Sequence, residues 1–184
     1  MKLNIRKLSV AGLLGALSVV MGLVPMIGFI PVPTAAQNAT IMQIPAILGA
    51  VAEGPAVGLF VGFIFGLMSW LRATNPMFAD PLVAVLPRLF IGVAAYYAFA
   101  AARRLPLSAR LGVAAVVGTL TNTVLVLSLI VLRGYLTGAV ALSVGLIHGS
   151  AEVIVAVIIV TAIGLALARA GFLRRSETKA GRSA

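Results

Sequence analysis

The stretch Gln43–Arg88, QIPAILGAVAEGPAVGLFVGFIFGLMSWLRATNPMFADPLVAVLPR, holds the features that decide the fold of this 184-residue chain. Glycine recurs in it every four residues, so on a helix four glycines fall on one face: Gly54, Gly58, Gly62 and Gly66. In water such a series weakens a helix, because each Gly costs about 1 kcal/mol relative to Ala. Among apolar residues in lipid, the same series lets a neighbouring helix approach closely. The stretch therefore predicts closely packed membrane helices.

The composition of the chain is that of a polytopic membrane protein. It is 61% hydrophobic and 10% charged, with a mean hydropathy of +1.15, and no soluble domain of this size needs so much apolar surface. The formal net charge of +10 would suit nucleic acid. However, the basic residues sit at the ends of apolar segments, where they orient helices in a bilayer, so no nucleic-acid partner is expected. The absence of cysteine excludes disulfides and thiolate metal sites.

Six apolar segments are candidates to cross a bilayer core of about 30 Å. We expect a single integral-membrane domain with helices over residues 8–30, 39–52, 55–71, 82–102, 111–132 and 139–168 and a basic tail over 169–184. With the N-terminus inside, six crossings place eleven of the fourteen Lys and Arg residues on the inner side, and only Arg72 and Arg133 in outer loops. This asymmetry predicts an all-α membrane protein with six transmembrane helices and cytoplasmic N- and C-termini.

Three ionisable residues fall within the expected spans, and each is a candidate functional group, because a charge there costs about 2.5–3.5 kcal/mol. Arg88 lies about 9 Å into its helix by helical rise, and either binds a ligand or extends to the outer headgroups. His148 and Glu152 are four residues apart and share one helix face. They either line the floor of a cavity or form a structural pair with each other or with Thr121 or Asn122. Glu152 lies about 20 Å along its helix, so a direct salt bridge to Arg88 is not expected.

Four uncharged residues complete the candidate substrate-binding set. Asn122 is an amide near mid-span and needs a hydrogen-bonding partner, and Gln43 is placed to reach the same cavity. Trp70 either stacks on a ligand or anchors its helix at the membrane interface. Asn75 belongs to the loop over residues 72–81, which either acts as a lid or is simply solvated. The full set is Gln43, Trp70, Asn75, Arg88, Asn122, His148 and Glu152.

Two further patterns bear on partners and on catalysis. Small residues four apart, Ala11 with Gly15 and Gly12 with Ala16, predict close packing on the first helix, either within the chain or against a partner's membrane helix. The sequence contains no GxxxxGK[ST], HExxH or GxSxG motif and no paired-carboxylate metal motif. We therefore expect no enzyme activity, cofactor or metal, and no ATP hydrolysis by this chain alone.

Four stretches, taken in order, make the chain similar to the substrate-binding S component of an energy-coupling factor (ECF) vitamin transporter. They are KLSVAGLLGALSVV (Lys7–Val20), IPAILGAVAEGPAVGLFVGFIFG (Ile44–Gly66), Pro87-Arg88-Leu89 and GTLTNTVLVL (Gly118–Leu127). The loop NPMFADP and the pair Asn122-Thr123 look most similar to the pantothenate-type branch of that family.

This resemblance implies a multi-pass protein of a prokaryotic cell membrane that binds a vitamin in a pocket facing outside. The partners it implies are a membrane T component and two cytoplasmic ATPase subunits, which supply the energy for inward release. By the same resemblance, the T component would contact the small residues of the first helix: Ala11, Gly12, Gly15 and Ala16. Pantothenate would place its carboxylate at Arg88 and its hydroxyls and amide at Asn122, His148 and Glu152.

Two alternatives come from other functional classes. An intramembrane enzyme would use His148 and Glu152 as acid and base and would turn over substrate by itself. A helix-packing scaffold would need the glycine series alone, and no ligand would stabilise it.

Overall fold

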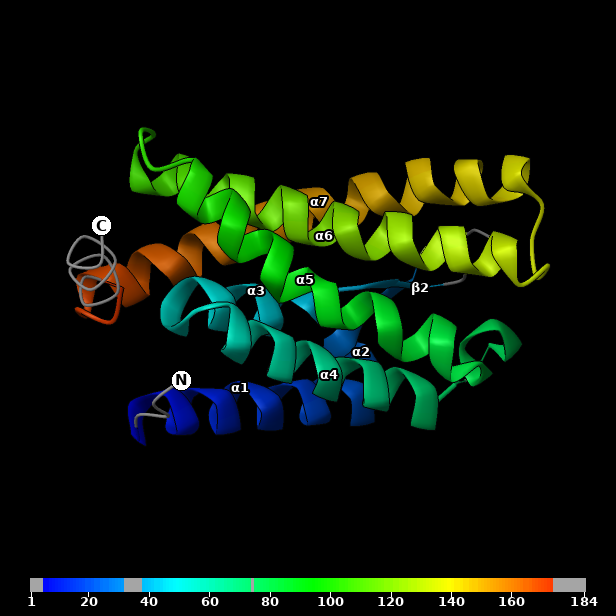
Figure 1. The fold of residues 1–184 in the computed structure, drawn as a ribbon, viewed down its shortest axis with the longest axis horizontal. Coiled ribbons are helices and arrows are strands. Elements are labelled where there is room, and N and C mark those ends of the chain that lie inside the picture. The colour runs from blue at the N-terminus through cyan, green and yellow to red at the C-terminus, as the bar shows by residue number, and fades with distance from the viewer. Residues whose placement is uncertain (1–4, 32–37, 74, 174–184) are drawn as a thin grey trace.

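The computed structural model describes residues 5–31, 38–73 and 75–173, and these fold into a bundle of helices (Figure 1). The elements in chain order are α1 (Ile5–Leu23), α2 (Pro25–Gly28), β1 (Phe29–Pro31), β2 (Asn38–Thr40), α3 (Gln43–Glu53), α4 (Pro55–Leu71), the 3₁₀ turn η1 (Pro76–Ala79), α5 (Pro81–Ala101), α6 (Leu107–Leu132) and α7 (Gly138–Arg169). The basic tail expected over 169–184 lies outside the described residues from position 174 onward.

Four helices of the described chain, α1, α5, α6 and α7, are long and apolar enough to cross a membrane, whereas α3 and α4 are shorter apolar helices. Large apolar side chains are exposed on α6 and α7, including Val124 (58%), Ile154 (61%) and Ile158 (62%). A soluble monomer rarely exposes such continuous apolar surface. The expected all-helical membrane class is therefore supported, with four long candidate spans.

The predicted first helix over 8–30 is wrong beyond Leu23. Pro25 lacks a backbone N–H and disfavours helical geometry at the residue before it, so α1 ends there and a new short helix begins. The chain then forms β1, which pairs antiparallel with β2 in the register Phe29–Thr40. Because β2 occupies residues 38–40, the second predicted helix begins at Gln43 rather than at Ala39. The sequence pattern did not predict this strand pair.

The glycine series packs α4 against α5, as its spacing predicts. A Cβ added at Gly58 would lie 2.8 Å from the Cα of Gly92, and one at Gly66 would lie 2.9 Å from the Cα of Val85. A Cβ at Gly62 would overlap the carbonyl oxygen of Arg88. Only glycine permits such backbone contact.

Gly54 does not take part in this contact, although its four-residue spacing continues the series; it lies just before the helix predicted over 55–71. It has a φ of +101° and nothing within 4 Å of an added Cβ, and it forms the turn between α3 and α4. The helical packing surface of α4 therefore contains three glycines, not four.

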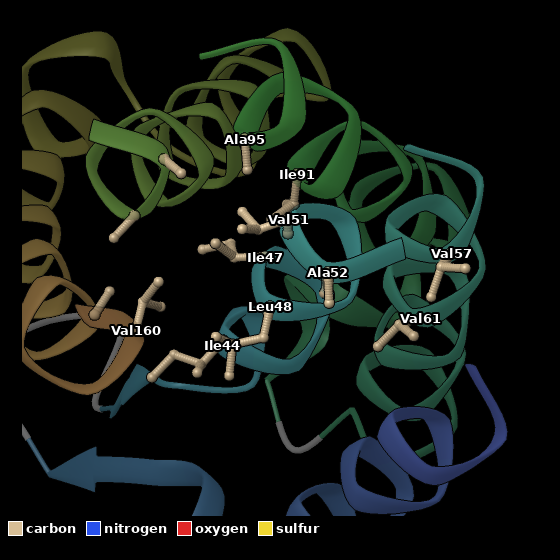
Figure 2. Close-up of a cluster of buried hydrophobic side chains, with 14 of the residues drawn as sticks. Ile44, Ile47, Leu48, Val51, Ala52, Val57, Val61, Ile91, Ala95 and Val160 are labelled. Atoms are coloured by element: carbon tan, nitrogen blue, oxygen red, sulfur yellow. The ribbon is translucent and has the colours of Figure 1, made fainter. Parts of the chain in front are cut away.

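The short helix α3 lies inside the bundle, and its residues Gln43 to Ala52 are all buried. Figure 1 shows α1 along one side of the bundle and α6 with α7 along the opposite side. Figure 2 shows Val51 of α3 beside Ile91 of α5, within one continuous apolar cluster. On α6, a Cβ at Gly118 would lie 2.8 Å from Ile47 and 3.2 Å from Ala95. Three helices, α3, α5 and α6, thus meet around Gly118.

Arg6 of α1 contacts the ends of α3 and α7 at one end of the bundle. Its Nε lies 2.5 Å from a carboxylate oxygen of Glu53 at the end of α3, and its guanidinium donates to the carbonyl of Phe172, just after α7. The start of α1 and the end of α7 accordingly lie at the same end of the bundle (Figure 1). The opposite end carries η1 and the start of α5.

Candidate functional site

Arg88 is a buried cation, with only 3% of its surface exposed. Its guanidinium carbon lies 5.4 Å from the ring centre of Phe65 and 5.1 Å from that of Phe78, distances suited to cation–π attraction. Its Nε has no hydrogen-bonding partner, and no carboxylate of the described residues forms an ion pair with it. The side chain therefore does not extend to the surface, and its charge has no direct counter-ion within the described chain.

The local sequence explains why the Arg88 side chain is held in this position. Pro87 lies inside α5 and has no N–H, so the carbonyl four residues earlier, that of Val83, loses its helical partner. A terminal nitrogen of Arg88 donates to that same carbonyl, at 2.5 Å. The Arg88 side chain thus supplies a hydrogen bond to the carbonyl that Pro87 leaves without one. This bond also fixes one edge of the guanidinium.

Glu152 of α7 is held by two donors from distant parts of the chain. One carboxylate oxygen accepts a hydrogen bond from the backbone N–H of Thr40 in β2 at 2.8 Å, and the other accepts one from the Thr123 hydroxyl of α6 at 3.3 Å. Glu152 forms no direct ion pair with Arg88, which lies on α5. Glu152 therefore joins three elements, rather than pairing with Thr121 or Asn122.

His148 lies one turn from Glu152 on α7 and is 5% exposed. It forms a hydrogen bond with the backbone of Val144 on its own helix. The next residue, Gly149, lies against Thr123, with an added Cβ at 3.3 Å from the threonine methyl. The face of α7 that carries His148 and Glu152 thus packs on α6 at Thr123.

Two buried amides have polar atoms without partners. Gln43 is fully buried and Asn122 is 4% exposed, and neither end of the Gln43 amide nor the Asn122 carbonyl oxygen finds a hydrogen bond. Leaving a buried polar group unpaired costs about 1–3 kcal/mol. The sequence predicts that the Asn122 amide needs a hydrogen-bonding partner. The described part of the chain provides none for its carbonyl oxygen.

The loop between α4 and α5 is anchored at several points. The Asn75 side chain accepts from the N–H of Met77, and the Asp80 side chain accepts from that of Leu82. Asp80 is also buried and ion-paired with Arg133 at the end of α6. Trp70 is 40% exposed, and its indole N–H donates to the carbonyl of Ala79.

Trp70 thus bonds to the end of η1, and Asn75 caps the start of η1. Sequence reasoning missed the two aromatic rings at Arg88, because Phe65 and Phe78 lie in different elements and no periodicity links them to it. The only hint in the sequence was that Phe78 lies in the loop between Asn75-Pro76 and Asp80-Pro81.

The small residues of α1 divide between two faces. Ala11 and Gly15 are buried, and a Cβ added at Gly15 would lie 3.6 Å from Phe60 of α4. Gly12 and Ala16 are exposed, and nothing lies within 4 Å of an added Cβ at Gly12. The first pair therefore packs within the chain, and only the second pair is available to a partner.

Comparison with known proteins identifies the family. A family model described as "ECF transporter, substrate-specific component" matches residues 6–164. The pantothenic acid transporter PanT of Lactococcus lactis subsp. cremoris is 32% identical over 162 residues, which cover 71% of this chain and 78% of that protein. The pantothenate transporter PanT of Leuconostoc mesenteroides subsp. mesenteroides is 31% identical over 86 residues, 42% of each chain. These matches confirm the resemblance read from the sequence: the chain belongs to the family of substrate-specific components of ECF transporters.

Proposed function

We propose that this chain is the high-affinity pantothenate-binding subunit of an ECF-type importer in a bacterial cell membrane. The observation that carries the proposal is Arg88, a buried cation for which the described part of the chain provides no ion-paired carboxylate. Burying an unpaired charge is costly, and a guanidinium pairs favourably with a carboxylate. Pantothenate carries one carboxylate, and the two relatives described above are named for its transport.

The proposed topology has six membrane-crossing helices and both termini in the cytoplasm. The helix α3 is about 16 Å long by helical rise, shorter than a bilayer core, but other helices enclose it, so its ends need not reach lipid headgroups. The excess of basic residues near the termini and between α5 and α6 favours this orientation. It puts η1 and the Arg88 half of α5 on the outer side.

Energy for transport must come from partner subunits in this proposal. The chain has no phosphate-binding loop, and the family is that of substrate-specific components. We propose a membrane T component and two ATPases as these partners, with Gly12 and Ala16 on the exposed face of α1 as contact residues. The buried pair Ala11 and Gly15 supports that face from within.

The intramembrane-enzyme alternative has no support in the geometry. Both carboxylate oxygens of Glu152 accept hydrogen bonds from Thr40 and Thr123, so the group is a fixed acceptor rather than a free general base. The family assignment is likewise that of a transporter component, not of an enzyme.

The ligand assignment is tested by thermal unfolding of the purified protein in detergent with a panel of water-soluble vitamins. Pantothenate should stabilise the protein most, by about 2.7 kcal/mol at a hundred times its Kd. A larger effect from another vitamin, with none from pantothenate, would refute the assignment.

The coupling assignment is tested by uptake of labelled pantothenate into cells with and without the ATPase and T-component genes. We expect accumulation against a gradient only when all partners are present. Active accumulation by this chain alone would contradict the proposal.

A further inference from the structure

We infer that Arg6 is a positioning residue that holds the inner end of α1, and with it the exposed face of that helix, in the orientation that a membrane partner binds. This inference rests on the proposed function, in which Gly12 and Ala16 of that face contact the T component. Arg6 itself belongs neither to the candidate ligand site nor to the small residues of α1. Its role follows from its contacts at the end of the bundle opposite η1.

The first turns of α1 are not held by apolar packing. The buried residues of α1 begin at Ala11, and none of residues 5–10 is buried. Farther along, the helix lies close to α4, where a Cβ added at Gly22 would lie 3.0 Å from the Cβ of Met68. A segment with few buried contacts opens more easily than the rest of a fold. Residues 5–10 therefore need another contact to hold them against the bundle.

Arg6 supplies this contact. Its Nε lies 2.5 Å from a carboxylate oxygen of Glu53, and its guanidinium donates to the carbonyl of Phe172. The guanidinium carbon also lies 5.6 Å from the centre of the Phe172 ring. The Glu53 side chain is only 8% exposed, so water screens this ion pair less than it screens a pair at the surface. One side chain of α1 is thus attached to the end of α3 and to the segment after α7.

The two groups that bind Arg6 are themselves fixed in the bundle. Glu53 is the last residue of α3, and every residue of α3 before it is buried. After α7, Gly171 has a φ of +80° and turns the chain back, and Leu173 is 6% exposed within the apolar core. Arg6 therefore attaches α1 to a well-packed part of the bundle.

The charges indicate that Arg6 serves this attachment rather than the stability of its own helix. A cation in the first turn of a helix opposes the helix dipole, so Arg6 does not stabilise α1 by itself. In the described part of the chain, Asp80 pairs with Arg133 and Glu152 accepts from Thr40. Glu53 is the carboxylate that the described residues place at the inner end, and it pairs with α1.

The orientation of α1 affects the contact proposed for the partner. Gly12 and Ala16 lie about 9 and 15 Å along the helix from Arg6 by helical rise. Small residues stabilise a pair of membrane helices only where the two backbones approach closely, so a tilt of α1 away from the bundle weakens that contact. If only a fraction of the molecules hold α1 correctly, the apparent affinity for the partner falls by that fraction.

The first experiment measures the affinity of the full chain for the purified T component–ATPase complex of the same organism, by fluorescence titration in detergent. Arg6→Gln and Glu53→Gln each remove one member of the ion pair. The double variant Arg6→Glu/Glu53→Arg restores the pair with its charges reversed. Lys7→Gln is the matched control, because it removes the same charge one residue away, and the ion pairs of the described residues do not include Lys7.

We expect Arg6→Gln and Glu53→Gln each to weaken partner binding by about tenfold. Pantothenate affinity should stay unchanged in both, because Arg88 lies toward the opposite end of the bundle. The double variant should recover most of the partner affinity, and Lys7→Gln should bind the partner normally.

A second experiment measures whether α1 moves, using distances between spin labels by electron paramagnetic resonance. The chain contains no cysteine, so labelled cysteines can be placed at exposed positions of α1 and α6. One pair is Ile5 with Ser108 at the inner end, and the other is Val20 with Leu132 at the outer end. Arg6→Gln should broaden the distance distribution of the inner pair and leave that of the outer pair unchanged.

Unchanged partner affinity or unchanged inner distances in Arg6→Gln would overturn the inference, and so would a double variant that recovers no partner affinity. An equal loss of partner and pantothenate binding would also overturn it, because Arg6 would then support the whole fold rather than the position of α1. Failure of the unmodified protein to bind the T component–ATPase complex would instead overturn the proposed function.

Discussion

Pro87 and Arg88 act as one unit at the scale of single residues. The proline removes the helical hydrogen bond to the Val83 carbonyl, and the arginine supplies a replacement from its side chain. This arrangement holds the guanidinium near the rings of both Phe65 and Phe78, while its Nε stays unpaired. The hydrogen bond that Pro87 removes from the helix is thus replaced by one that fixes the orientation of the Arg88 guanidinium.

Replacing Pro87 should disturb binding without preventing folding. In Pro87→Ala the new N–H competes with Arg88 for the Val83 carbonyl, so the guanidinium loses its fixed edge. We expect pantothenate affinity to fall about tenfold, measured by titration calorimetry. Pro81→Ala, at the first position of the same helix where no carbonyl is freed, is the control and should bind normally. Equal affinity of Pro87→Ala and the unmodified protein would contradict this role.

Replacing Gln43 should separate binding from stability. In Gln43→Met the unpaired amide is lost while apolar packing is kept, so the ligand-free protein should be as stable as the unmodified one, or more stable by about 1–3 kcal/mol. The stabilisation by pantothenate should fall at the same time. Thermal unfolding with and without ligand measures both. A marked loss of stability in the ligand-free variant would show that the amide is structural.

At the scale of elements, the α4–α5 contact sets the position of the Arg88 backbone. A methyl group at Gly62 would meet the carbonyl of Arg88 directly. Gly62→Ala should therefore separate the two helices, lower stability by about 1–3 kcal/mol and weaken ligand binding. Gly12→Ala is the matched control, since nothing lies near its added Cβ, and it should leave the isolated protein within about 0.5 kcal/mol of the original.

Denaturation of both variants in the same detergent makes the comparison direct. If Gly62→Ala and Gly12→Ala were equally stable, close packing at Gly62 would not be required, and the link between the glycine series and the binding site would be lost.

The hydrogen bond between β2 and α7 depends on the side chain of Glu152. Glu152→Gln keeps an oxygen that can accept from the Thr40 N–H, whereas Glu152→Ala leaves that N–H without its partner. Charged acceptors contribute about 1.5–3 kcal/mol per hydrogen bond, so the alanine variant should be markedly less stable and the glutamine variant intermediate or near normal. Thermal unfolding checks this order. Equal destabilisation by the two changes would mean that the charge itself, not the acceptor, is what matters.

At the scale of the whole molecule, local patterns predicted the helical class well. The range 55–71 coincides with α4, and the four-residue spacing predicted the contacts of Gly58, Gly62 and Gly66, because helix periodicity is a property of neighbouring residues. The sequence singled out Arg88, Asn122, His148 and Glu152 as polar residues within apolar segments, and all four are buried, although for Arg88 the sequence left an extension to the headgroups open.

Contacts between distant segments could not be read from the sequence. The strand pair, and the hydrogen bond from Thr40 to Glu152 across 112 positions, depend on how the helices pack rather than on any local pattern. The same holds for the ring of Phe78 over Arg88 and the ion pair between Asp80 and Arg133. These contacts hold the candidate polar residues in place, and they explain why the sequence indicated the polar residues inside the helices but not the residues that contact them.

The central claim is that Arg88 binds the carboxylate of the ligand. Titration of the protein and of Arg88→Met in nanodiscs with pantothenate and with pantothenol, in which a neutral alcohol replaces the carboxylate, tests it most directly. We predict that the unmodified protein prefers pantothenate by at least about tenfold and that Arg88→Met loses this preference, because only the charged ligand gains from the guanidinium. A variant that still prefers pantothenate by the same factor would contradict the account.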